Sequence, residues 1–219
     1  GTRLASFGTF TLDSNTTAND NTGLGYGALA TTTTGANNVA VGSQALIANT
    51  TGANNTAVGT FVLKLNTTGE ANVAIGNDCM DSNTTGTNNV AIGVDALQAN
   101  TTADSNTAIG RSSLGENTTG HSNVAVGSTA LDANTTGNQN VGVGKDALTE
   151  CTTGGANTAV GQSAGGAVTS GSNNLILGQD AGLTGSPGGA ISTGSNVIVL
   201  GDENITAANI QVDWTVASD

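Results

Sequence analysis

The strongest constraint on the fold of this chain is a glycine that recurs at a constant 17-residue period. It closes a short phrase of the form Asn-x-Ala-Val-Gly, and the same spacing reaches back to Gly8. From Gly178 to Gly201 the interval is 23, which places a six-residue insertion within residues 179–193. So regular a period predicts stacked structural repeats. The glycines that carry the phrase are Gly25, Gly42, Gly59, Gly76, Gly93, Gly110, Gly127, Gly144, Gly161 and Gly178.

A 17-residue unit fits one coil of a β-solenoid. It is too short for repeats built from helix pairs, and it matches neither a heptad nor a helical period. Within each phrase the side chains alternate with a period of two, which is typical of a strand. We therefore predict an all-β parallel β-solenoid, or β-roll, of about eleven coils. Its expected parts are an N-terminal lead-in (1–7), the repeats (8–201) and a C-terminal cap (202–219).

The two faces of the predicted strand differ in size. The residue before each glycine is aliphatic in all ten phrases, and Val or Thr usually stands two residues earlier. We expect this larger face to point inward, together with one large apolar residue four positions after the glycine. The small residue between the aliphatic ones would then face a neighbouring chain. The predicted interface is Ala40, Ala57, Ala74, Ala91, Ala108, Ala125 and Ala159.

An asparagine stands four residues before every phrase-closing glycine. In parallel coils about 4.8 Å apart, identical amides can stack and hydrogen-bond along the axis as a ladder. The alternative is a turn-forming asparagine, since Asn tolerates the left-handed backbone region. A second motif, Asn-Thr-Thr-Gly, is expected to turn the chain into its next coil. The predicted ladder includes Asn38, Asn55, Asn72, Asn89, Asn106, Asn123, Asn140 and Asn157.

The apolar content per coil is low for a free-standing solenoid. Only 2% of residues are aromatic, and each coil offers about three medium or large apolar side chains, whose burial barely offsets the ordering entropy at ~25 cal/mol per Å². We therefore predict that three identical chains assemble around a common axis.

Charge and residue clustering restrict the partners. The net charge is −12 and the four basic residues are scattered, which argues against binding nucleic acid or an anionic membrane. The acids fall at repeat positions, such as Asp78 and Asp95, and read as solvated columns, with calcium between coils as the alternative. His121 has no partner at metal or triad spacing, and Cys79 and Cys151 read as substitutions within columns. We expect no enzymatic activity, no metal and no cofactor.

The unit Asn-x-Ala-Val/Ile-Gly-x-x-Ala-Leu-x-x-Asn-Thr-Thr-Gly resembles the repeats of bacteriophage tail-fibre proteins, over about residues 8–201. The phrase Asn-Val-Ala-Val/Ile-Gly is also similar to the head repeat of trimeric autotransporter adhesins, whose repeat is shorter. The resemblance implies a left-handed β-roll assembled as a parallel homotrimeric fibre. It implies a rod on the virion tail that serves host attachment, with other fibre segments and a host surface glycan or protein as partners. A bacterial surface adhesin and, remotely, an ice-binding solenoid are the alternatives.

The last segment, "NIQVDWTVASD", resembles the strand that opens the endosialidase-type intramolecular chaperone domain of phage fibres and spikes. In that family the chaperone promotes trimerisation and then cuts itself off at a Ser-Asp junction. The resemblance implies that Ser218 would be the junction serine. The alternative for this segment is that Trp214 covers the open end of the stack.

Overall fold

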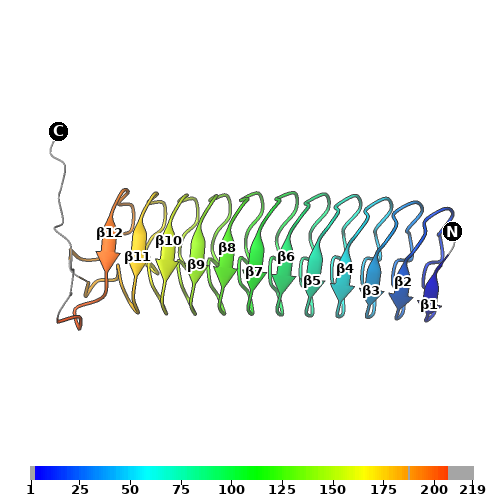
Figure 1. Cartoon of the computed structure of the whole chain (residues 1–219), viewed down its shortest axis with the longest axis horizontal. Coiled ribbons are helices and arrows are strands. Elements are labelled where there is room, and N and C mark those ends of the chain that lie inside the picture. Colours follow the sequence, from blue (N-terminus) through cyan, green and yellow to red (C-terminus); the bar gives the residue numbers. More distant parts are fainter. Residues whose placement is uncertain (1–2, 187, 207–219) are drawn as a thin grey trace.

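The computed structural model describes residues 3–186 and 188–206, which form one parallel β-solenoid. Its short strands stack in chain order into a single sheet that runs the length of a rod, with β1 and β12 at opposite ends (Figure 1). The described residues contain no helix. The strands are β1 (Ala5–Phe7), β2 (Thr22–Leu24), β3 (Val39–Val41), β4 (Thr56–Val58), β5 (Val73–Ile75), β6 (Val90–Ile92), β7 (Thr107–Ile109), β8 (Val124–Val126), β9 (Val141–Val143), β10 (Thr158–Val160), β11 (Leu175–Leu177) and β12 (Ile198–Leu200).

The strand register confirms the 17-residue repeat. Each strand from β1 to β10 pairs with the next at this same offset, beginning with Ala5 opposite Thr22. The last pair, Leu175 opposite Ile198, has an offset of 23. At roughly 4.8 Å per coil the stack is about 50 Å long. Because β1 lies inside the expected lead-in, the paired stack begins at Ala5 and not at Gly8.

The six extra residues lie where the sequence predicted an insertion. Gly165 N–H still donates to Ala181 O at the usual offset of 16, whereas Thr169 N–H donates to Ser192 O at an offset of 23. The insertion is therefore confined between these two points. Inside it, the buried Ser186 hydroxyl accepts from Gly182 N–H at 2.7 Å and donates to Asp180 O at 3.2 Å, which fixes the loop against the last coil.

The corners of each coil use left-handed backbone. Most coils have three such non-glycine residues, two and four positions after the phrase-closing glycine and directly before the ladder asparagine, as at Gln44 (φ 57°), Leu46 (φ 52°) and Asn54 (φ 61°). The phrase-closing glycine is more demanding. Gly59 has φ 136°, and a Cβ there would lie 2.5 Å from Gly76 O in the next coil. Only glycine satisfies both the conformation and the stacking distance.

Candidate functional surface

The predicted asparagine ladder is confirmed. The ladder asparagines Asn21 to Asn174 are buried, and the side-chain oxygen of each accepts a hydrogen bond from the backbone N–H at the same position of the next coil, which is an asparagine except at Val197. Asn72 N–H, for example, donates to Asn55 Oδ1 at 3.0 Å, and Asn55 Nδ2 donates to Gly69 O at 2.9 Å. The left-handed residue of this corner is the one before the ladder asparagine, so the turn role falls to its neighbour.

The Asn-Thr-Thr-Gly asparagines form a second buried ladder, which sequence reasoning had interpreted only as a polar turn. Asn66 Nδ2 donates to Asn49 Oδ1 at 3.0 Å, and Asn83 Nδ2 donates to Asn66 Oδ1 at 2.8 Å. The signal was present in the sequence, because these asparagines recur at the same period as the first ladder. The members of this second ladder are Asn49, Asn66, Asn83, Asn100, Asn117 and Asn134.

In each of the six coils that hold a second-ladder asparagine, one carbonyl joins the two ladders. Gly69 O accepts from Asn55 Nδ2 at 2.9 Å and from Asn66 Nδ2 at 3.1 Å, so both of its lone pairs are used. The same arrangement recurs at Ala103 O, which accepts from Asn89 at 2.8 Å and Asn100 at 3.2 Å. Because buried polar groups are costly unless they are paired, this cross-link makes each coil depend on its neighbours.

The second ladder ends where its column changes residue type. Cys151 follows Asn134, and its thiol donates to Gly154 O at 3.6 Å in place of an amide. At the other end, Asn49 Nδ2 reaches Thr32 Oγ1 at 3.4 Å. Within the described part of the chain, two buried side-chain oxygens lack a hydrogen-bond partner, Asn134 Oδ1 and Asn15 Oδ1. Both lie next to a column position that holds no asparagine.

The structure contradicts the predicted role of the alanine column. Ala40, Ala57, Ala74, Ala91, Ala108, Ala125 and Ala159 all have no exposed surface within a single chain. They belong to the interior cluster that also holds the large apolar column, such as Leu46 and Leu63, so they cannot contact a neighbouring chain. The physical reason is volume, because the leucine already fills most of the coil. In one coil the large apolar residue four positions after the glycine is replaced by Gly165, and the strand position that faces it holds Ile176 instead of alanine. A Cβ on Gly165 would lie 2.8 Å from that isoleucine.

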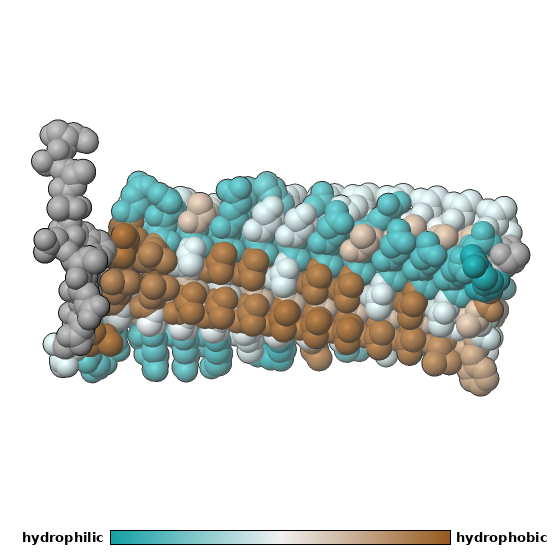
Figure 2. All heavy atoms as spheres, viewed as in Figure 1, coloured by the Kyte–Doolittle hydropathy of each residue, from teal (hydrophilic) through white to brown (hydrophobic). Residues whose placement is uncertain are grey.

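The aliphatic residues expected inside lie instead on the outer face of the sheet. Figure 2 shows them as two rows along the rod, which we call the apolar stripe. The row at the third strand position is continuous; Ile75 keeps 38% of its surface exposed, and Ile92 and Ile109 keep 37% each. Threonine interrupts the other row. The stripe comprises Thr22, Val39, Thr56, Val73, Val90, Thr107, Val124, Val141, Thr158, Leu175 and Ile198, and Leu24, Val41, Val58, Ile75, Ile92, Ile109, Val126, Val143, Val160, Leu177 and Leu200.

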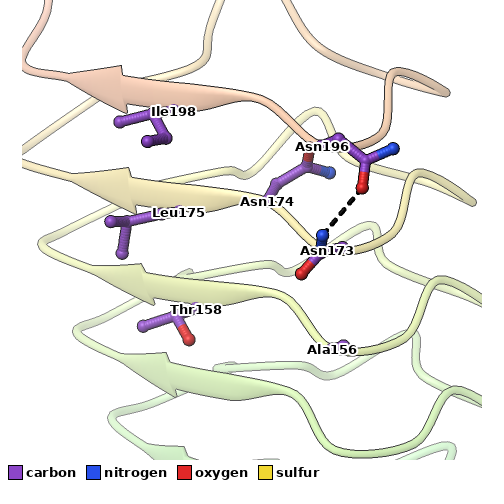
Figure 3. Close-up of a pocket in the computed structure, with 7 residues that line it drawn as sticks. All are labelled: Ala156, Thr158, Asn173, Asn174, Leu175, Asn196 and Ile198. Atoms are coloured by element: carbon purple, nitrogen blue, oxygen red, sulfur yellow. Dashed lines mark hydrogen bonds between the residues drawn. The ribbon is translucent and has the colours of Figure 1, made fainter. Parts of the chain in front are cut away.

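A pocket of about 350 Å³ opens beside the stripe at β10, β11 and β12 (Figure 3). Ala156 forms one side of it, and two exposed amides lie at its rim, with Asn173 Nδ2 donating to Asn196 Oδ1 at 2.7 Å. Thr158, Leu175 and Ile198 of the stripe form the other side. The pocket thus lies between the stripe and the neighbouring corner of these coils.

The two threonines of each turn have different roles. Thr50 Oγ1 donates to Thr67 O in the next coil at 3.1 Å, whereas Thr51 is exposed. The first threonine of the pair therefore contributes to coil stacking, and the second presents a single column to solvent. This arrangement is not the paired array of exposed threonines that an ice-binding face would use.

Three aspartate carboxyls on the coils have shifted pKa values. Burial raises the pKa of the Asp81 and Asp132 carboxyls, and the Thr129 hydroxyl lowers that of Asp146 by donating to it. His121 is exposed, and its backbone N–H donates to Asn138 Oδ1 at 2.8 Å. Among residues 3–186 and 188–206, no three His, Cys, Asp or Glu residues are grouped as a metal site.

The cysteines are buried and protonated. Burial raises the pKa of the Cys79 thiol to about 12 and that of Cys151 to about 11. Cys79 occupies the small-residue column three positions after the glycine, as expected, and its thiol donates to Ala91 O at 3.3 Å.

Ser218 and Trp214, on which the chaperone-junction prediction rests, lie outside the described residues. In the part of the chain that is described, no helix has the length and apolar character needed to cross a membrane. Comparisons with models of known families, with curated proteins and with solved structures gave no match to this chain.

Proposed function

We propose that this chain is the shaft of a bacteriophage tail fibre or spike, a homotrimeric rod that serves host-cell attachment from the virion tail. The observation that carries the proposal is the uniform cross-section of the stack. Each coil from β2 to β9 repeats the same inward leucine or methionine and the same backbone bonds to its neighbours, and the ladder asparagine repeats from β2 to β11. A chain built in this way extends along one axis, which is what a spacer requires.

The internal bonding supports a stiff spacer. Backbone hydrogen bonds join neighbouring coils at the strand and also at the corners, as between Leu46 N and Val62 O at 3.0 Å and between Asn54 N and Ala36 O at 3.0 Å. The two ladders add bonds in the interior. Bending the rod would have to break bonds on one side of several adjacent coils, so the stack resists lateral force.

The sequence of the repeat supports the assignment to a phage fibre over that to a bacterial adhesin. The full unit, including Asn-Thr-Thr-Gly, resembles tail-fibre repeats, whereas the shorter Asn-Val-Ala-Val/Ile-Gly phrase is the part shared with adhesin heads. The spacing that the strand register confirms is longer than the adhesin head repeat.

Light scattering and negative-stain electron microscopy of the purified chain test the proposal together. We expect a particle with three times the chain mass of 21.1 kDa and a straight rod about 50 Å long. Antibodies raised against it should label the tail of the virus that encodes it. Labelling of a bacterial cell surface would overturn the phage assignment, and a stable monomer would overturn the trimer.

A further inference from the structure

We propose that the apolar stripe is the face through which copies of this chain associate, side by side and over their full length. The inference rests on the proposed fibre and identifies its interface. The stripe takes the place of the alanine column as the candidate interface, because the alanines are enclosed within each chain. It occupies the outer face of the sheet from β2 to β12, and no residue among 3–186 and 188–206 covers it (Figure 2).

The exposed area is of the size that stable association needs. The third strand position leaves between 37% and 47% of Leu24, Ile75, Val160, Leu177 and Leu200 exposed. The other third-position residues and the first-position row, which includes four threonines, are mostly half-buried. Together the two rows expose on the order of 1,000 Å² per chain, compared with about 800 Å² per partner in a standard interface. The largest apolar patch of a typical soluble monomer is only about 300–600 Å². The stripe is therefore larger than a monomer normally leaves in water.

The charge distribution favours a copy of the same chain. A net charge of −12 would oppose self-association if the charges lay on the contact face. However, none of the residues in β1 to β12 is charged. The column two residues before each strand is also uncharged from Asn37 to Asn196. Charged residues are depleted in this way at interface cores.

The shape of the stripe points to a partner with the same repeat. Its side chains recur once per coil, at about 4.8 Å, along a straight line. A second copy presents the same spacing over the same length, so that every coil can make an equivalent contact. Full overlap buries the most area, because each coil of stagger leaves one coil uncovered at each end.

The first experiment places charge on the stripe. We expect the combined variant Ile75→Glu, Ile92→Glu and Ile109→Glu to raise the dissociation constant of the oligomer by roughly 100-fold or more. The milder combination Ile75→Thr, Ile92→Thr and Ile109→Thr keeps β-branched residues on the strands and should weaken association less while preserving the fold. The matched control is Thr68→Glu, Thr85→Glu and Thr102→Glu, which adds the same charge to exposed residues elsewhere on neighbouring coils.

Sedimentation equilibrium, with circular dichroism to verify folding, separates the outcomes. Folded stripe variants that dissociate while the control stays associated support the proposal. An oligomer that both stripe variants leave intact overturns the stripe and leaves the fibre standing. A wild-type chain that stays monomeric overturns both. A stripe-dependent dimer supports the stripe and contradicts the trimeric fibre.

A second experiment measures the overlap with the single substitutions Leu24→Cys in β2 and Leu177→Cys in β11. The native cysteines are buried, so a short thiol crosslinker acts on the introduced groups. Parallel chains in full overlap crosslink Leu24→Cys to itself, which supports the proposal. Reversed chains in full overlap crosslink only the mixture of the two variants, which supports the stripe and contradicts a parallel fibre. An oligomer that gives neither product is staggered, and full overlap is then wrong.

Discussion

The substitution Thr32→Asn should stabilise the protein by completing the second ladder at its N-terminal end. At present Thr32 separates Asn15 from Asn49. Asn15 Oδ1 is buried without a partner, and Asn49 Nδ2 reaches Thr32 Oγ1 at only 3.4 Å. An amide at this position can donate to Asn15 Oδ1 and accept from Asn49 Nδ2, in the geometry that Asn66 and Asn83 show at 2.8 Å. No new unpaired group arises, because both neighbours are asparagines.

The magnitude follows from the groups that gain partners. An unpaired buried acceptor costs about 1–3 kcal/mol, and a hydrogen bond contributes about 1 kcal/mol net. Asn15 is only half-buried, which places the expected gain at the low end. We therefore expect the free energy of unfolding to rise by about 1–2 kcal/mol, or the Tm by about 4 °C for a chain of this size.

Urea and thermal unfolding of the wild type and the variant measure this gain. The control Thr32→Val removes the hydroxyl without supplying an amide and should lower stability. In the double variant Asn15→Ala with Thr32→Asn, most of the gain should disappear, because the orphaned oxygen is gone. If Thr32→Asn destabilises the chain as much as Thr32→Val does, the missing asparagine of the second ladder does not limit the stability of this coil.

Three further substitutions or measurements test other parts of the fold. Gly59→Ala should lower the free energy of unfolding, measured by thermal melting, by about 2 kcal/mol or more beyond the effect of Gly69→Ala. The reason is that φ is 136° at Gly59, whereas alanine already occupies the position equivalent to Gly69 in another coil. Asn72→Ala should lower the free energy of unfolding by about 2–4 kcal/mol, because Asn89 N–H loses its acceptor; a loss under about 0.5 kcal/mol would refute the ladder's importance. The thiols of Cys79 and Cys151 should stay unmodified by a thiol reagent at pH 8 in the folded chain. Because their folded pKa values lie above the unfolded value of 9.0, stability should fall as the pH rises from 9 toward 11 and 12, and replacing both with alanine should remove that part of the fall.

Much of the fold was predictable because it depends on identity between copies. The 17-residue period, the strand position and the stacking of Asn38 on Asn21 all follow from residues that recur at one spacing. The second ladder was equally visible in the recurrence of Asn49 and its equivalents. It was missed because Asn-Thr-Thr-Gly also reads as a turn, and local turn chemistry gives no sign that the asparagine side chain points into the coil.

The sequence by itself determined the length of the coil, the residues that stack and the place of the insertion, because each of these is a matter of spacing along the chain. Only the tertiary structure decided which face of the strand is inside. Alternation separates Val39 and Val41 from Ala40 without saying which side is enclosed. That choice depends on the volume left once Leu46 has entered the coil: the enclosed strand position is alanine beside Leu46 and becomes Ile176 where the leucine is replaced by Gly165. The exchange of Gly165 and Ile176 follows the same rule, and the excluded aliphatic residues become the apolar stripe on the surface.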